Sequence, residues 1–403
     1  MRAYERLIRY SQVDTTSKED GTEIPSTKTQ FQLGELLAAE MKAIGMEDIA
    51  LDEHAYVYGF IPASKGCENR DTIALIAHLD TAPDFAGDHV RPQIVEHYDG
   101  GDLQLGQSGR ILSPSVFPDL KNLVGHTLIT TDGNTLLGAD DKAGIAEVMT
   151  VCEEIIQDQP EHGRIAVCFT PDEEIGHGAA LLSMERLGAD YAYTIDGDDI
   201  DTINCETFNA AEATVSIHGV NVHPGTAKNK MRNAAIVAME FNALLPAEER
   251  PEHTDGYAGF YHLVEMEGNV ETAYLRYIVR DHSACGFDER KEKMRQVEEN
   301  LNEHYGEGTV HLSIREQYRN MEEVLTDYPQ VAERAVNAIR KAGFVPKRTP
   351  VRGGTDGAQL SFRGLPCPNL GTGGAAFHGP YEHISAENMD HMVRILKIML
   401  TDP

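Results

Sequence analysis

Three consecutive acidic residues at positions 172–174 follow the apolar run Ile165–Phe169 after only Thr170 and Pro171. The run is short and rich in β-branched residues, so it predicts an inner β-strand that ends at Pro171. Open α/β sheets bind ligands beyond the carboxyl ends of their strands. Carboxylates crowded there repel one another unless solvent or a cation surrounds them. The stretch therefore leaves two interpretations open, a solvated acidic turn and a cation site.

A second predicted strand, Thr72–Ala77, ends in His78-Leu79-Asp80. Strand side chains repeat every two residues, so His78 and Asp80 are expected to point the same way. This geometry suits an imidazole that ligates a metal while a carboxylate holds its second ring nitrogen. A His-Asp hydrogen bond without a metal is the alternative.

Acidic residues also stand at two further element ends. Asp140 and Asp141 precede a helical pattern over 143–156, and Asp196 follows the predicted strand Tyr191–Ile195. A carboxylate that caps a helix explains one of the first two residues, but not both. Such repeated placement of acids and a histidine at element ends favours the cation site over solvated turns.

Composition narrows the class of protein. A net charge of −30 argues against nucleic acid or an anionic membrane as partner. Neither a signal-peptide pattern nor an apolar stretch of membrane-spanning length is evident. The six cysteines are scattered without a Cys-x-x-Cys pair, which is typical of reduced residues in a cytoplasmic protein.

The pattern changes after Cys205, where strands and helices are predicted in the order β-α-β-β-α-β. We expect residues 207–318 to form an inserted second domain, and residues 1–206 and 319–403 to form the first domain together. In the second part, the glycine-rich stretch 371–379 predicts a turn that brings His378 to the site.

These motifs resemble the metal-site motifs of the co-catalytic dizinc exopeptidases related to aminoacylase and glutamate carboxypeptidase. The resemblance implies an α/β fold, in which a catalytic domain with a mixed sheet flanked by helices carries an inserted lid and dimerisation domain. The motifs that carry it are His78-Leu79-Asp80, Gly138-Ala139-Asp140-Asp141-Lys142-Ala143-Gly144, Thr170-Pro171-Asp172-Glu173-Glu174-Ile175-Gly176, Ile195-Asp196-Gly197 and Phe377-His378-Gly379.

The resemblance implies two Zn²⁺ per subunit. Asp140 is then the ligand that bridges both ions. His78 and Asp196 are the further ligands of one ion, and Glu174 and His378 are those of the other. The segment around His383 differs in detail from the family pattern, which leaves His383 as the alternative to His378.

The resemblance also implies how the chemistry is divided. A water that bridges the zinc ions attacks the scissile carbonyl, and Glu173 is its general base. Asp80 orients His78. The peptide bond between Asp140 and Asp141 is expected to be cis.

Three further stretches resemble specifically the tripeptide aminopeptidases of this family, namely residues 219–228, 352–356 and 366–370. This resemblance implies a homodimer in which His223 stabilises the oxyanion of the partner subunit's substrate. Arg280 and Arg352 are implied to bind substrate carboxylate or carbonyl groups. Without the resemblance, the favoured explanation of these three residues would be a loop imidazole before a proline for His223 and solvent ion pairs for the two arginines.

Two other functions fit the same motifs. A deacylase or carboxypeptidase of the same dizinc family would share every metal ligand and differ near Arg280, Arg352 and Asn369. A metal-dependent binding protein that has lost catalysis is a further alternative. The intact Glu173 argues against it, because a binding site gains nothing from an unligated acid beside Glu174.

Overall fold

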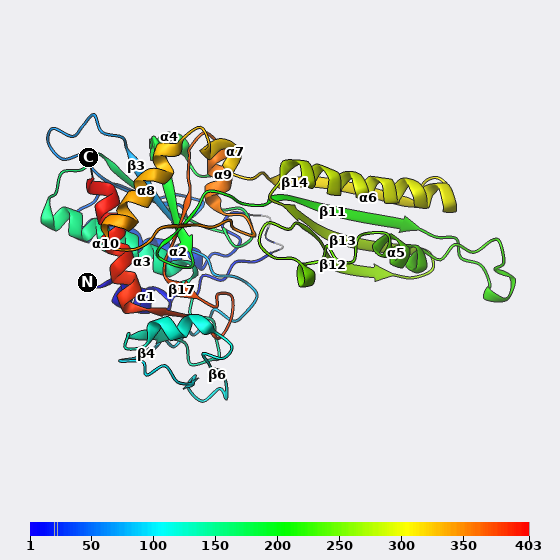
Figure 1. Cartoon of the computed structure of the whole chain (residues 1–403), viewed down its shortest axis with the longest axis horizontal. Coiled ribbons are helices and arrows are strands. Elements are labelled where there is room, and N and C mark those ends of the chain that lie inside the picture. The colour runs from blue at the N-terminus through cyan, green and yellow to red at the C-terminus, as the bar shows by residue number, and fades with distance from the viewer. Residues whose placement is uncertain (20, 22, 403) are drawn as a thin grey trace. The chain divides into compact units, whose positions relative to one another are not determined.

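The computed structural model describes residues 1–19, 21 and 23–402, which divide into two compact units (Figure 1). Unit 1 contains Met1–Cys205, Val324–Thr349 and Thr355–Pro403, and unit 2 contains Glu206–Glu323 and Pro350–Gly354. Unit 2 thus covers the predicted insert 207–318 and adds short flanking pieces. Among the described residues, no helix is both long and apolar enough to cross a membrane.

The main sheet of unit 1 is mixed. In the part of the chain that the structure describes it has eight strands, which in spatial order are β1 (Glu47–Leu51), β2 (Val57–Ile61), β8 (Ile165–Thr170), β3 (Ile73–His78), β9 (Tyr191–Gly197), β16 (Asn369–Gly371), β10 (Thr202–Asn204) and β15 (Lys347–Arg348). The central strands β8, β3, β9 and β16 run parallel. The mixed sheet confirms the predicted fold class.

Helices cover both faces of this sheet. Alternate side chains of β3 point to opposite faces, and on each face they pack in a hydrophobic core that contains helices. Ile73, Leu75 and Ala77 pack in the core that includes α1 (Ala3–Tyr10), α2 (Gln30–Ile44), α3 (Ala139–Asp158), α8 (Pro329–Lys341) and α10 (Ala386–Thr401). Ala74 and Ile76 pack in the core that includes α4 (Met184–Leu187) and α9 (Asp356–Phe362). Short α7 (Glu322–Leu325) lies where the chain returns from unit 2 to unit 1.

A smaller antiparallel sheet of unit 1 has the order β17 (Gly374–Ala375), β18 (His383–Ser385), β7 (Leu128–Thr130) and β4 (Gln93–Val95). Beside it lie the hairpin of β5 (Leu103–Gln104) and β6 (Ile111–Leu112) and the 3₁₀ helix η1 (Pro118–Leu123). This sheet joins residues 93–130 to the late segment 374–385, which carries His378.

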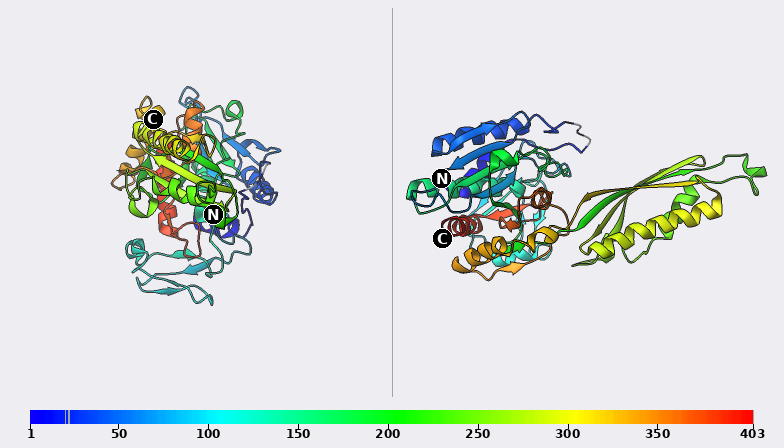
Figure 2. Two further views of the ribbon diagram at one scale, coloured as in Figure 1. Left: turned by 90° about the vertical axis from the view of Figure 1, so that its right-hand side faces the viewer. Right: turned by 90° about the horizontal axis from the view of Figure 1, so that it is seen from above.

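Unit 2 is a two-layer sandwich whose elements follow in the order β11 (Asn209–His218), η2 (Pro224–Thr226), α5 (Ala234–Ala243), η3 (Pro251–His253), β12 (Phe260–Gly268), β13 (Thr272–Asp281), α6 (Ala284–Tyr305) and β14 (Val310–Tyr318). Helices α5 and α6 pack on one face of the antiparallel sheet β12-β13-β11-β14 (Figure 2). On β13, residues 273, 275, 277 and 279 belong to that core. The alternate residues, Arg276 and Arg280 among them, therefore lie on the open face.

Candidate metal centre

Three neighbouring parallel strands of unit 1 end at the same edge of the sheet. Strand β3 ends at His78, β8 is followed by Glu173 and Glu174, and β9 contains Asp196 next to its last residue. The parallel register makes this convergence a direct result of the sheet topology.

Asp140 lies between two imidazoles. Its Oδ1 is 2.9 Å from Nε2 of His78, and its Oδ2 is 3.3 Å from Nε2 of His378. The regular geometry of α3 begins only after Asp141, because Asp140 and Asp141 have non-helical backbone angles. The peptide bond that joins these two residues is cis, as expected.

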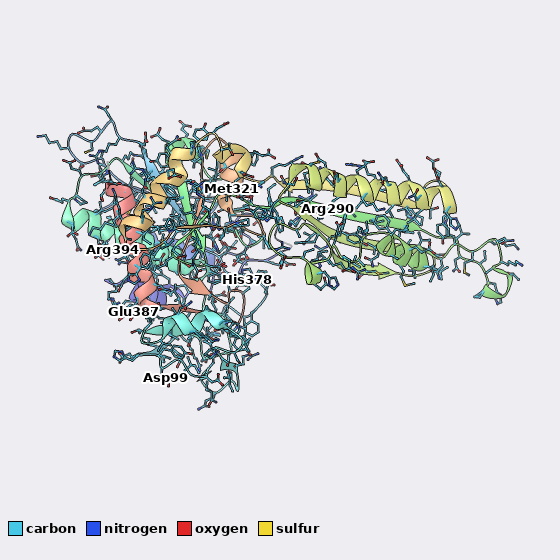
Figure 3. All side chains as sticks on the ribbon, in the orientation of Figure 1. Asp99, Arg290, Met321, His378, Glu387 and Arg394 are labelled. Atoms are coloured by element: carbon cyan, nitrogen blue, oxygen red, sulfur yellow. The ribbon has the colours of Figure 1, made fainter. Side chains whose placement is uncertain are left out.

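Each imidazole has a second carboxylate beside it. Asp196 Oδ1 is 3.6 Å from His78 Nε2, and Glu174 Oε2 is 3.1 Å from His378 Nε2. His378, labelled in Figure 3, also has Asp84 Oδ2 3.5 Å from its Nδ1. The structure thus brings together all five residues that the sequence suggested as metal ligands.

The pKa values show how strongly these groups interact. The carboxylates of Asp140 and Glu174 raise the pKa of His378 to about 11. Burial, and then the charge of Asp140, raises the pKa of Glu174 to about 8 and that of Asp196 to about 6. Burial opposes ionisation of Asp140 as well, but hydrogen bonds from His378 and His78 hold its pKa below the usual range. The cluster therefore holds protons that a bound cation would displace.

The donor set fits a metal ion. One ligand atom from each of His78, Asp140 and Glu174 lies within 4.8 Å of the other two, and the same holds for His78, Asp141 and Asp196. Glu174 Oε1 is buried without a hydrogen-bond partner in the part of the chain that the structure describes. An ion would satisfy this atom, which is costly to bury alone.

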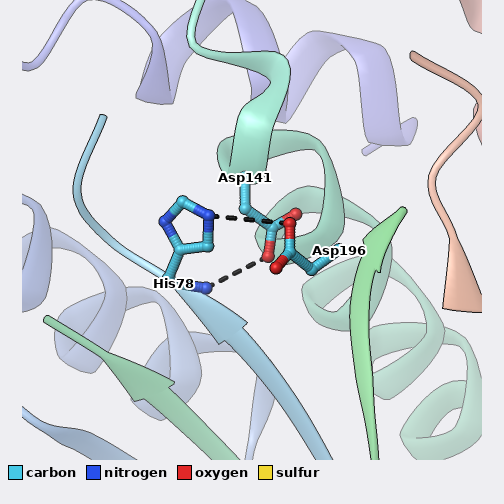
Figure 4. A group of neighbouring side chains, drawn as sticks. All are labelled: His78, Asp141 and Asp196. Atoms are coloured by element: carbon cyan, nitrogen blue, oxygen red, sulfur yellow. Dashed lines mark hydrogen bonds and ion pairs between the residues drawn. The ribbon is translucent and has the colours of Figure 1, made fainter. Parts of the chain in front are cut away.

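Asp141 differs from Asp140 in what its oxygens contact. Its Oδ2 accepts the backbone N–H of His78 at 3.1 Å (Figure 4), and its Oδ1 accepts that of Gly144 at 3.2 Å. Asp141 therefore ties the start of α3 to the end of β3. The bond to Gly144, three residues further along the chain, caps the regular part of α3. A helix cap therefore explains Asp141 and leaves Asp140 for the two imidazoles.

Asp80 supports the turn after β8. Its Oδ1 accepts the backbone N–H of Glu173 at 2.9 Å, and its Oδ2 accepts that of Glu174 at 3.2 Å. The expected contact with His78 is less direct, because the Nδ1 of His78 lies 3.0 Å from the backbone carbonyl of Asp80 and 3.4 Å from its carboxylate. The carboxylate is turned toward the two backbone N–H groups instead.

The carboxyl group of Glu173 makes no hydrogen bond or ion pair with any residue that the structure describes. Burial, followed by the charge of Asp196, raises its pKa well above the usual range. A carboxyl group with a raised pKa and no protein partner can take up and release a proton.

Asp172, the first of the three acids, binds the N-terminal part of the chain. Its carboxylate accepts the backbone N–H and the hydroxyl of Ser26, both at 2.6 Å, and the side-chain amide of Gln30 at 2.7 Å. Its φ of 56° places the backbone in the left-handed region directly before Glu173. The sequence indicates no role for Asp172, because its partners Ser26 and Gln30 lie 146 and 142 residues away.

His383 lies away from this cluster. Its Nε2 is 2.7 Å from Asp119 Oδ2, and its Nδ1 is 2.8 Å from the carbonyl oxygen of Tyr381. Both ring nitrogens are thus engaged, whereas His378 contacts Asp140 and Glu174. The geometry favours His378 as the last ligand.

The three predicted substrate-binding residues belong to unit 2. His223 is exposed, and its Nδ1 accepts the N–H of Gly225 at 3.1 Å. Arg280 lies over the ring of Tyr318 and donates to the carbonyls of Ala211 and Val279.

Arg352 is held more firmly than Arg280. Its guanidinium donates to the carbonyls of Gly256 at 2.6 Å and Ala258 at 2.9 Å, and to Oγ1 of Thr254 at 3.1 Å. It also lies over the rings of Phe208 and Phe260. In this structure Arg352 therefore fixes the loop 254–258.

The chain belongs to peptidase family M20/M25/M40, whose pattern matches residues 126–402. Over nearly its whole length it is similar to proteins named peptidase T. That of Geobacillus sp. (strain WCH70) is 51% identical over 388 residues, which cover 96% of this chain and 94% of the relative. That of Alkaliphilus oremlandii (strain OhILAs) is 49% identical and covers 98% of each chain. Family membership confirms the predicted hydrolase class.

Solved structures show the same fold. The aminopeptidase PepT of Bacillus cereus ATCC 10987 superimposes with a TM-score of 0.78 at 23% identity, covering 99% of this chain and 97% of that one. A dinuclear metal-binding peptidase of family M20 from Bacillus subtilis has a TM-score of 0.66 at 13% identity, covering 99% and 98%.

Proposed function

We propose that this chain is a zinc-dependent aminopeptidase that releases the amino-terminal residue of tripeptides. One observation carries the proposal: Asp140 lies between His78 and His378, and each imidazole has a further carboxylate beside it. Imidazole and carboxylate are ordinary zinc donors. The relatives named peptidase T support the substrate class.

The five ligands would divide between two ions. His78 and Asp196 would hold one ion, Glu174 and His378 the other, and Asp140 both. When bound, zinc ions lower the pKa of the attacking water and polarise the scissile carbonyl.

Glu173 moves the proton. Its carboxylate takes a proton from the water that attacks the scissile carbonyl, and its carboxylic acid then gives that proton to the leaving amine. Asp80 keeps the Glu173 backbone in place by accepting its N–H.

Recognition of a tripeptide needs groups for both ends of the substrate. The acidic surroundings of the centre favour the free ammonium, and Arg280 or Arg352 binds the carboxylate through charge-assisted hydrogen bonds. We assign the protein as a cytoplasmic homodimer, in which unit 2 is the lid and dimerisation domain. We assign to His223 the stabilisation of the oxyanion in the partner subunit's site.

The test is a panel of matched peptides. Zinc-loaded protein is incubated with a di-, tri- and tetrapeptide of related sequence, with amino-acetylated and carboxyl-amidated tripeptides, and with an acetyl-amino acid. We expect release of the amino-terminal residue from the free tripeptide, and weak action on the others. Cleavage of the acetyl-amino acid without action on the tripeptide would establish the deacylase instead. Two zinc ions bound without any hydrolysis would point to a binding protein.

A further inference from the structure

Glu382 connects two separate parts of the candidate metal centre. The residue is only 1% exposed. Oε2 accepts the backbone N–H groups of Leu137 at 2.6 Å and Gly138 at 2.8 Å, and Oε1 accepts that of Asp140 at 3.0 Å. Three backbone donors from one turn therefore meet on one buried carboxylate.

The turn that Glu382 binds has no regular structure of its own. Gly138 has a φ of 74°, and the backbone angles of Asp140 and Asp141 are non-helical. The N–H groups at the start of a helix have no partner within the helix. Glu382 supplies such a partner for the N–H of Asp140, the residue whose two carboxylate oxygens face the imidazoles of His78 and His378.

Glu382 also lies in the segment that carries the other ligand. It follows His378 by four residues, and its own N–H donates to the carbonyl of Gly379 at 3.3 Å. The two segments that Glu382 joins therefore carry Asp140 and His378, whose side chains are themselves 3.3 Å apart.

We propose that Glu382 is a positioning residue that fixes the orientation of Asp140 toward both His78 and His378. This inference rests on the proposed function, because it concerns the residue assigned there as the shared ligand. A carboxylate is required at this position. An amide has only one acceptor oxygen, and its NH₂ group would face at least one of the three N–H donors.

The experiment compares Glu382→Gln with Glu147→Gln. Glu147 is a matched control because it is also a fully buried glutamate of unit 1, and its oxygens have no hydrogen-bond partner within the described residues. Zinc affinity is measured by competition with a chromophoric chelator, and folding by thermal unfolding of the metal-free proteins. We expect Glu382→Gln to fold and to bind zinc about 10- to 100-fold more weakly, as for other residues that orient ligands. Glu147→Gln should keep the parent affinity.

Two results would overturn the proposal. One is a folded Glu382→Gln protein that binds two zinc ions within twofold of the parent affinity. The other comes from hydrogen exchange in the metal-free parent protein, which needs no variant. The amides of 137, 138 and 140 should be strongly protected, and exchange as fast as in the exposed turn 65–66 would contradict their bonding to Glu382. Failure of the parent to bind zinc would instead overturn the proposed function, and the exchange measurement would still decide the role of Glu382.

Discussion

Units 1 and 2 differ in what their functional side chains contact. In unit 1, one ligand atom from each of His78, Asp140 and Glu174 lies within 4.8 Å of the other two. Asp80 and Glu382 accept backbone N–H groups of the turns that carry the proposed ligands. In unit 2, His223 is exposed and Arg352 donates to carbonyls of its own unit.

This difference separates two tasks. The charges of the metal centre are placed by the fold of unit 1, so their arrangement requires no substrate. In unit 2 the side chain of His223 faces solvent, and that of Arg352 is already bonded. Binding of a substrate by Arg352 therefore requires an exchange of hydrogen-bond partners. Metal binding and substrate recognition should therefore respond differently to mutation.

The largest effect should come from the metal centre. Asp140→Ala should lose bound zinc and all measurable turnover, because both imidazoles lose their common carboxylate. Glu173→Ala should keep two zinc ions and lose activity by about 10²- to 10⁴-fold, the usual contribution of a general base. Zinc content is measured by atomic absorption and turnover with a tripeptide, with the exposed Glu185→Ala as control. Full zinc occupancy in Asp140→Ala would contradict its role as the shared ligand.

The second effect concerns the exposed imidazole of unit 2. If His223 acts in the partner subunit's site, His223→Ala and Glu173→Ala proteins should each be nearly inactive. A mixture of them should regain activity after subunit exchange, because one site of each heterodimer then has both residues. Exchange is followed with differently tagged chains. Heterodimers that form without any recovered activity would remove the cross-subunit role.

A smaller effect is expected for Arg352. Arg352→Lys keeps the charge but loses the planar pair of donors, so KM for a free tripeptide should rise about 10-fold, with a smaller change in kcat. The preference for a free over an amidated carboxyl terminus should fall in parallel. Arg276→Lys, on the open face of the unit 2 sheet, is the control. An unchanged preference, together with a lower melting temperature, would show that Arg352 serves only to hold the loop 254–258.

The smallest effect is on the pH dependence of stability, through Asp356. Burial raises its pKa to about 7, and only its Oδ2 has a partner in the described chain, the hydroxyl of Thr170. Because the folded pKa exceeds the unfolded value of about 3.9, this group's stabilising contribution is complete below the unfolded pKa. It is lost as the pH rises to about 7, by at most about 1.4 kcal/mol per pH unit.

Asp356→Asn should flatten this dependence, because an amide has no such proton to lose. Urea unfolding of the metal-free protein between pH 5 and 8 measures it, with the exposed Asp88→Asn as control. Parallel curves for Asp356→Asn and the parent would show that Asp356 keeps an ordinary pKa.

The sequence predicted those site residues that end strands. Apolar runs stop abruptly at His78, before Glu173 and at Asp196, so both the strand and its terminal acid or histidine are visible in the sequence. Asp172 and Glu382 were not predicted, because their partners are N–H groups and side chains distant in sequence, and a backbone N–H leaves no mark in a sequence. The carboxylate of Asp80 was expected to bond the imidazole of His78. Instead it accepts the backbone N–H groups of Glu173 and Glu174 at 2.9 and 3.2 Å, closer than the 3.4 Å to the imidazole.

The bond between Glu382 and Leu137 spans 245 residues of the chain, which bears on how the enzyme is made. During synthesis the turn 137–140 emerges long before the segment 378–382, and unit 2 is made in between. A nascent chain that ends before residue 378 has neither the last predicted ligand nor the residue that holds Asp140. Under the proposed ligand assignment, a complete metal centre therefore requires residues 378–382, which are among the last to be made.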